Sequence, residues 1–300
     1  MSHISRRRFI QAGLAGSAIY TSKTLALDIG GMLGKAAPYI QHVQPLIQAM
    51  TFSEADEIKM GESFYPQYIK KSGGAYGDDK LQAALKKFAT PFVKTSDRKN
   101  LKWDIVLLNN KEVNAWALPG GKVAINSGLL SYTKDPAELA SVIAHEMGHI
   151  ELSHGIAQMK TKAFTSSLSG AGKQALADFG GAGGALSSQL LSSIEGPLFD
   201  LVNKGYSRTN EYEADAHIIS VFKKMGFDQH KADDFFVTLN KLYPSDTSVT
   251  TSLFSTHPGN QERISKLEEL AKQQESISKN IKMTGWNELK EAFPNKKLPS

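Results

Sequence analysis

Apolar residues recur at helical spacing between residues 136 and 150, and this is the clearest pattern in the chain. The positions that share one face of such a helix are Leu139, Val142, Ile143 and Ile150. Asp135 suits the N-cap, Pro136 suits the first helical position, and Glu138 follows the cap as in a capping box. The pattern therefore predicts a capped helix whose apolar face packs into the core.

Further helix-start signals predict a mainly helical α+β fold. Ser53 opens a pattern that predicts a helix to about Lys71, and another helix is expected from Asp78 or Asp79 through Phe88. Three runs of strand-forming residues then precede the helix of the first pattern directly. These runs are residues 103–108, 113–118 and 122–126. Because they follow one another closely, we expect a small antiparallel sheet beside the helix.

Positive charge is concentrated at the N-terminus. The formal net charge of the 300-residue chain is +5. Arg6, Arg7, Arg8 and Lys23 lie in a stretch without acidic residues, so the remainder is nearly neutral. Since no predicted helix or strand carries a concentrated basic face, we expect no nucleic-acid partner.

The first 26 residues have the pattern of an export signal. The run SRRRF at 5–9 resembles a twin-arginine signal, and Lys23 and a small-residue end at Ala26 fit that route. A general secretory signal is the alternative, and both predict a periplasmic or otherwise exported protein. The organisation that we expect is a signal at 1–26, a lead-in segment at 27–50, one domain at 51–280 and a C-terminal tail at 281–300.

The chain contains no cysteine, and its apolar runs are too short to span a bilayer. We therefore expect no disulfide and no lipid-modified cysteine. A soluble protein, or one bound peripherally to a membrane, is expected. The sequence carries no signal for an oligomeric state.

The predicted helix at 136–150 carries candidate chemistry. His145 and His149 lie one turn apart, so their rings project side by side and can share a cation. Glu146 lies beside this pair, where a carboxylate can take a proton from an activated water. The three residues form the HExxH signature of zinc metallopeptidases. A chance match on a solvated helix is the alternative, and the capped apolar face argues against it.

A second acidic stretch supplies a third ligand. Glu211 lies near the start of a helix predicted to end at Gly226, at a suitable distance for a second helix to return to the metal. Asp215 lies one turn later, where it can accept the free ring N–H of a ligand histidine. Glu213 projects to the other side and is expected to be solvated. Two histidines and one glutamate leave a coordination position open, as a catalytic zinc site requires.

Three other features have two interpretations each. His154 is expected to be a polar helix-end residue, not a ligand, because its spacing does not match a metzincin motif. The segment 161–200 is rich in Gly, Ser and Ala, and is either a lid over the site or a surface helix pair. The strand formed by Asn114, Ala115, Trp116, Ala117 and Leu118 is either an edge that binds a substrate as an added strand or an internal strand.

The chain resembles the HtpX/Ste24/Oma1 superfamily of gluzincin metallopeptidases, in its exported BepA- and LoiP-like branch, over about residues 50–270. The segments that carry the resemblance are NAWALPGG at 114–121, GLL at 128–130, AELASVIAHEMGH at 137–149, NEYEAD at 210–215 and HPGNQER at 257–263. The sequence lacks the tetratricopeptide array of BepA-like members and the membrane spans of the embedded branches.

The resemblance implies a zincin-type domain that holds one Zn²⁺ through His145, His149 and Glu211, with Glu146 as the base. His257 is implied either as a fourth ligand in a latent state or as an oxyanion-stabilising residue. The implied activity is cleavage of misfolded or unassembled cell-envelope proteins. A chaperone-like protein with a blocked zinc site and a zinc amidase acting on cell-wall material are the alternatives.

Overall fold

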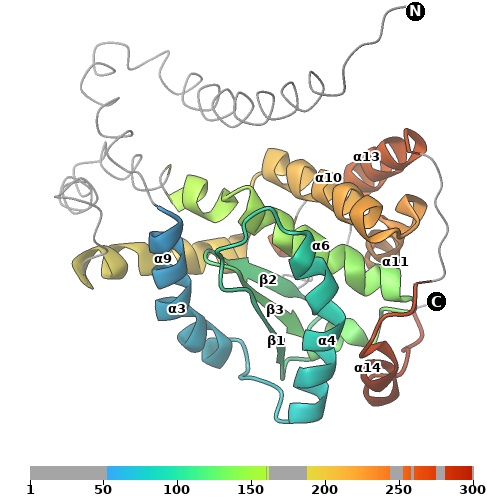
Figure 1. Cartoon of the computed structure of the whole chain (residues 1–300), viewed down its shortest axis with the longest axis horizontal. Coiled ribbons are helices and arrows are strands. Elements are labelled where there is room, and N and C mark those ends of the chain that lie inside the picture. The colour runs from blue at the N-terminus through green and yellow to red at the C-terminus, as the bar shows by residue number, and fades with distance from the viewer. Residues whose placement is uncertain are drawn as a thin grey trace, which may run out of the picture. The chain divides into compact units, whose positions relative to one another are not determined.

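The computed structural model describes residues 53–159, 161, 188–243, 253–257, 260–274 and 281–298 (Figure 1). The expected export signal at 1–26 and the lead-in segment at 27–50 lie outside these residues. Of the segment 161–200, only residue 161 and the helix that begins at Ser188 are described. None of the helices in the described part is both long and apolar enough to cross a membrane.

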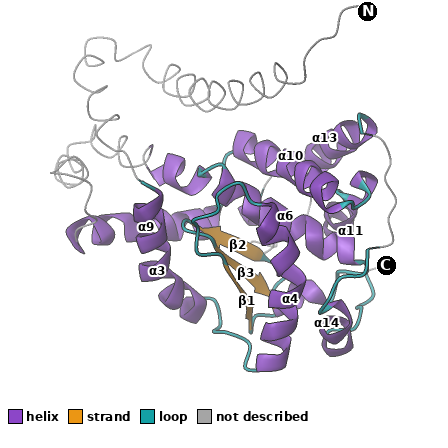
Figure 2. Cartoon of the chain, viewed as in Figure 1, coloured by secondary structure: helices purple, strands orange, loops and turns teal. Residues whose placement is uncertain are grey.

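A three-stranded sheet lies among the helices (Figure 2). Its strands are β1 (Asp104–Leu108), β2 (Ala115–Leu118) and β3 (Lys122–Asn126), in the order β1-β3-β2. The expected sheet is therefore present, but it is mixed, because β1 and β3 run parallel and only β2 and β3 run antiparallel. The tight turn at Gly120 and Gly121, which both have positive φ, folds β2 and β3 into a hairpin. The strand β1 pairs along the other edge of β3.

The first two helices in the described part of the chain begin where their caps predict. The helix α3 (Glu54–Lys71) starts with a complete capping box, in which Ser53 and Asp56 each accept a bond from the other's backbone. The side chain of Asp78 caps α4 (Asp79–Thr95). Pro91 lies within α4 without ending it, so the helix runs two turns beyond the expected end at Phe88.

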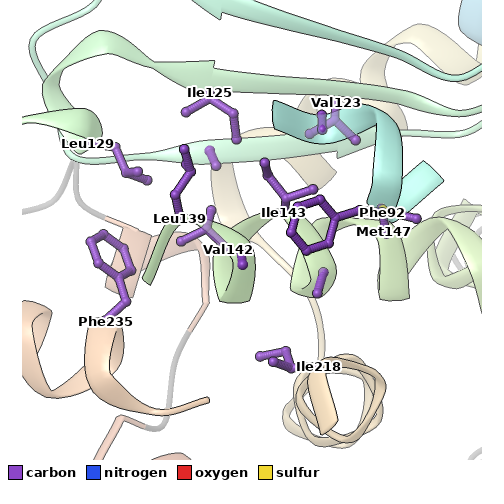
Figure 3. Close-up of a cluster of buried hydrophobic side chains, with 14 of the residues drawn as sticks. Phe92, Val123, Ile125, Leu129, Leu139, Val142, Ile143, Met147, Ile218 and Phe235 are labelled. Atoms are coloured by element: carbon purple, nitrogen blue, oxygen red, sulfur yellow. The ribbon is translucent and has the colours of Figure 1, made fainter. Parts of the chain in front are cut away.

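The helix α6 (Pro136–Glu151) forms the centre of the fold, and residues 137–150 are all buried. Asp135 caps it through the backbone N–H of Ala137, as predicted. In Figure 3, Leu139, Ile143 and Met147 of α6 lie between the sheet and the helix that carries Ile218. That helix is α10 (Arg208–Met225), which packs more extensively on α6 than any other helix does. The predicted apolar face is thus buried, and so is its opposite face.

Seven further helices complete the described part of the domain. They are α5 (Ser127–Leu130), α9 (Ser188–Lys204), η2 (Gln229–Lys231), α11 (Asp234–Leu242), α12 (Leu253–Thr256), α13 (Asn260–Lys272) and α14 (Trp286–Ala292). The helix α14 belongs to the segment that we expected to be a tail. It packs on α4, with the ring centroids of Trp286 and Phe88 5.9 Å apart. Phe293, just after α14, packs edge-on against Tyr76.

Candidate metal centre

The one-turn spacing on α6 brings the rings of His145 and His149 together inside the protein. Their Nε2 atoms lie 3.1 Å apart, and both side chains are almost completely buried. Each ring therefore directs the same nitrogen atom toward a shared point.

The helix α10 brings Glu211 to this point. One carboxylate oxygen of Glu211 lies 3.4 Å from Nε2 of His145, and the other lies 3.6 Å from Nε2 of His149. The close approach of α10 depends on Gly148, since a Cβ at that position would lie only 3.0 Å from the Cα of Ala214. The predicted cluster of His145, His149 and Glu211 is confirmed, and Gly148 is a helix-packing residue that sequence reasoning missed.

His257 adds a fourth potential ligand atom to the cluster, and this atom is its third nitrogen. Its Nδ1 lies 3.2 Å from Nε2 of His145 and 3.0 Å from a carboxylate oxygen of Glu211. The four potential ligand atoms of His145, His149, Glu211 and His257 all lie within 4.8 Å of one another. The structure therefore brings the loop histidine into contact with the three residues of the cluster.

The donor set fits a zinc ion. Ligand atoms about 2.0–2.1 Å from a tetrahedral zinc lie about 3.3–3.4 Å from one another. The separations among the two imidazole nitrogens and the Glu211 oxygens are 3.1, 3.4 and 3.6 Å. Burial alone raises the pKa of Glu211, but its interactions with His257, His145 and Arg263 together hold this pKa well below its usual range. Glu211 is therefore an anion, as a metal ligand must be.

Glu146 lies beside the cluster with an available carboxylate. Its side chain is completely buried, and neither oxygen has a hydrogen-bond partner among the described residues. Nε2 of His257 lies 3.5 Å from one of these oxygens. Burial raises the pKa of Glu146 above its ordinary value. A buried carboxylate of raised pKa, free of other partners, is suited to accept a proton.

Asp215 and Arg263 surround the outer nitrogen atom of His145. A carboxylate oxygen of Asp215 lies 3.0 Å from Nδ1 of His145. Arg263 donates two hydrogen bonds to Asp215, at 2.7 and 2.8 Å, and lies 3.0 Å from Glu211. Burial works to raise the pKa of Asp215, yet Arg263 holds this pKa below its usual range. Asp215 thus lies where we expected it. The role of Arg263 was not predicted, although Arg263 closes the HPGNQER segment at 257–263 that carries the resemblance.

The neighbours of His149 differ from those of His145. Nδ1 of His149 lies 2.9 Å from Nδ1 of His154, whose Nε2 lies 3.1 Å from a carboxylate oxygen of Glu213. Tyr206 stacks on His149, with ring centroids 3.7 Å apart and planes 10° apart. The expectation of a solvated Glu213 holds only in part, because a turn after α6 carries His154 back toward α10 and against the Glu213 carboxylate. The side chain of Glu213 is 34% exposed and pairs with His154.

The strand β2, which holds all of the candidate substrate edge except Asn114, lies at one side of the sheet. Among the described strands, only β3 pairs with it. The backbone N–H of Leu253 donates to the carbonyl of Val113, and the hydroxyl of Thr256 lies 3.5 Å from Oδ1 of Asn114. The helix α12, which ends next to His257, therefore covers the beginning of this edge.

Comparison with known proteins identifies relatives of this arrangement. The profile of peptidase family M48 matches residues 78–271. The metalloprotease YcaL of Escherichia coli is 37% identical over 153 residues, which are 51% of this chain and 56% of YcaL. The metalloprotease LoiP of the same species is 33% identical over 153 residues, with the same coverage of each chain.

A third relative aligns over more of the chain. The putative beta-barrel assembly-enhancing protease of Vibrio cholerae is 27% identical over 232 residues, which are 76% of this chain and 46% of that protein. This chain therefore spans about half the length of the curated relatives that it matches.

Proposed function

The chain belongs to peptidase family M48, and we propose that it is a zinc-dependent endopeptidase that cleaves misfolded or unassembled cell-envelope proteins. One observation carries this proposal. A buried cluster of two histidines and one glutamate lies beside Glu146, whose carboxylate has no hydrogen-bond partner in the described part of the chain. The choice of substrate is supported by the name of the Vibrio cholerae relative, which refers to β-barrel assembly.

His145, His149 and Glu211 would hold one Zn²⁺ per chain. A zinc ion in such a site lowers the pKa of water and polarises a carbonyl group. Asp215 accepts a hydrogen bond from Nδ1 of His145, so that Nε2 of this ring keeps its lone pair for the metal. Arg263 compensates the buried charges of Asp215 and Glu211.

Glu146 would act as the general base. Its carboxylate accepts a proton from the attacking water and then passes the proton to the leaving amine. The raised pKa of Glu146 brings its proton affinity closer to that needed near neutral pH. The substrate would bind in extended form along β2, with Asn114, Ala115, Trp116, Ala117 and Leu118 as the edge.

The position of His257 supports a latent enzyme. Its Nδ1 lies among the ligand atoms, and its Nε2 faces Glu146 at 3.5 Å. The ring therefore occupies space that an attacking water needs between the cluster and the base. In this state His257 would serve as the fourth ligand, and movement of α12 would expose both the site and the beginning of β2.

The same observation favours a second candidate function. If His257 stays in the cluster, α12 still covers the beginning of β2, and the protein would bind extended clients along the rest of this strand without cutting them, as a chaperone-like protein. For both functions, the SRRRF run and the small-residue end at Ala26 support export to the periplasm.

The test compares cleavage of casein and of an unfolded outer-membrane protein by the wild type, Glu146→Gln and His257→Ala, with the zinc content of each. We expect Glu146→Gln to keep its zinc and to lose about 10²- to 10⁴-fold in kcat. His257→Ala should keep its zinc and cut faster than the wild type. Zinc binding by all three proteins without any cleavage would favour the chaperone-like function, and a folded wild type without zinc would exclude the metallopeptidase.

A further inference from the structure

The two histidines of the cluster differ in what holds their second nitrogen atom. Nδ1 of His145 contacts a carboxylate directly, since it lies 3.0 Å from Asp215. Nδ1 of His149 contacts another histidine, His154, at 2.9 Å. The carboxylate at this side, Glu213, comes one step later, at 3.1 Å from Nε2 of His154. Each ligand ring is thus connected to a carboxylate of α10, one directly and the other through a second ring.

Only one arrangement of protons gives every donor an acceptor in the series His149–His154–Glu213, when the rings of His149 and His154 are neutral and His149 binds a metal. Nε2 of His149 must carry a lone pair toward the metal, so its proton lies on Nδ1. That N–H donates to Nδ1 of His154, which must then carry its own proton on Nε2. The Nε2–H of His154 donates to Glu213. Every donor therefore meets an acceptor, and the carboxylate at the end selects the tautomer of both rings.

The backbone around His154 is bent to place this ring. Ser153 has a φ of 54°, the one positive value among the non-glycine residues that the structure describes. Such a conformation costs free energy and persists only where the surroundings hold it. Arg98 holds it here, because its guanidinium donates to the hydroxyl of Ser153 and to the carbonyl of Ile150 at the end of α6. The turn brings His154 back against His149, and the ring is 3% exposed.

We propose that His154 and Glu213 are positioning residues that fix the tautomer and the orientation of His149 for metal binding. This inference rests on the proposed zinc site. The stacked ring of Tyr206 restrains the plane of His149, and the hydrogen bond that His149 donates to His154 restrains its rotation within that plane. Loss of such an outer hydrogen bond lowers metal affinity by about 10- to 100-fold in other metal sites.

The experiment measures the Zn²⁺ affinity of the full chain by competition with a chromogenic chelator. His154→Leu removes the acceptor, and His154→Asn, whose four side-chain heavy atoms branch as those of leucine do, retains an oxygen near the place of Nδ1. We expect His154→Leu to bind Zn²⁺ about 10- to 100-fold more weakly than the wild type. His154→Asn should recover most of this loss, and the exposed-residue control His230→Ala should bind as the wild type does.

A second pair of variants tests Glu213, the partly exposed end of the hydrogen-bonded series. Glu213→Gln keeps an acceptor for His154, whereas Glu213→Leu does not, so only Glu213→Leu should lower the affinity. This pair decides the matter if His154→Leu does not fold. Equal affinities of the wild type and the leucine variants would overturn the inference and leave the zinc site standing, as would equal losses in His154→Leu and His154→Asn. A folded wild type that binds no Zn²⁺ would instead refute the proposed function itself.

Discussion

Gly205 touches Thr256 so closely that a Cβ on Gly205 would lie 1.5 Å from the carbonyl oxygen of Thr256. Gly205 joins α9 to α10, and Thr256 directly precedes His257. The contact therefore connects the start of the helix that carries Glu211 with the segment that places His257 in the cluster. Any side chain at position 205 must push this segment away.

Gly205→Ala should release His257 from the cluster. The added methyl group displaces Thr256, and we expect casein cleavage to rise severalfold, toward the rate of His257→Ala. The left-handed φ of 74° adds a cost in stability of about 1–3 kcal/mol, which thermal unfolding would detect. Gly74→Ala is the matched control, since Gly74 has a φ of 83° and no atom near its missing Cβ. If both variants lose stability and neither cuts faster, the contact does not hold the segment.

Arg263→Ala should be strongly destabilising. The guanidinium is fully buried and compensates two buried carboxylates, Asp215 and Glu211. Removing one partner of a buried ion pair typically costs about 3–5 kcal/mol. Arg263→Lys should recover little of this, because an ammonium group cannot make the paired bonds to Asp215. Urea unfolding of the zinc-free protein measures the effect, and a loss below about 1 kcal/mol for Arg263→Ala would contradict the prediction.

Gly148→Ala should separate α6 from α10. The new Cβ would lie 3.0 Å from the Cα of Ala214 and from the Cβ of His217, and overpacking of this kind costs about 1–3 kcal/mol. Because α10 carries Glu211, Zn²⁺ affinity should fall together with the free energy of unfolding. Gly196→Ala, in α9, is the control, since no atom lies within 4 Å of its missing Cβ. Unchanged Zn²⁺ affinity in Gly148→Ala would show that the cluster tolerates this shift.

His217 should make the protein less stable as the pH falls from about 6.5 to 4. Burial lowers the pKa of His217 to about 4, and the nearby charge of Lys224 acts in the same direction. Its Nδ1–H donates to the carbonyl of Ala144 at 2.9 Å. Since the folded pKa lies below the unfolded value, the unfolded chain binds the proton first, and stability is lost through this window.

The measurement is the free energy of unfolding at several pH values for the wild type and His217→Gln. The glutamine has no titrating group, so its stability should fall less steeply between pH 6.5 and 4. The difference should approach, but not exceed, about 3 kcal/mol at the lower limit. Parallel curves for the two proteins would show that His217 does not titrate differently in the two states.

Much of the metal centre was predictable because it depends on spacing within single helices. The caps of α6, the one-turn separation of His145 and His149, and the one-turn separation of Glu211 and Asp215 are local properties of the chain. Helical geometry determines where such side chains point as soon as the helix forms. In the same way, the helical spacing of the apolar residues predicted which face of α6 is buried.

The remaining features depend on how distant segments meet. The parallel pairing of β1 with β3, the entry of His257 into the cluster and the contacts of Arg263 join residues far apart in the chain. The chain from His149 through His154 to Glu213 needs both the backbone turn at Ser153 and the close crossing of α6 and α10. The sequence by itself determined the capped helices α3, α4, α6 and α10 and three metal-binding side chains, because short-range geometry is enough for them. Only the tertiary structure decided what surrounds these side chains, because packing selects partners by shape and charge and not by their separation along the chain.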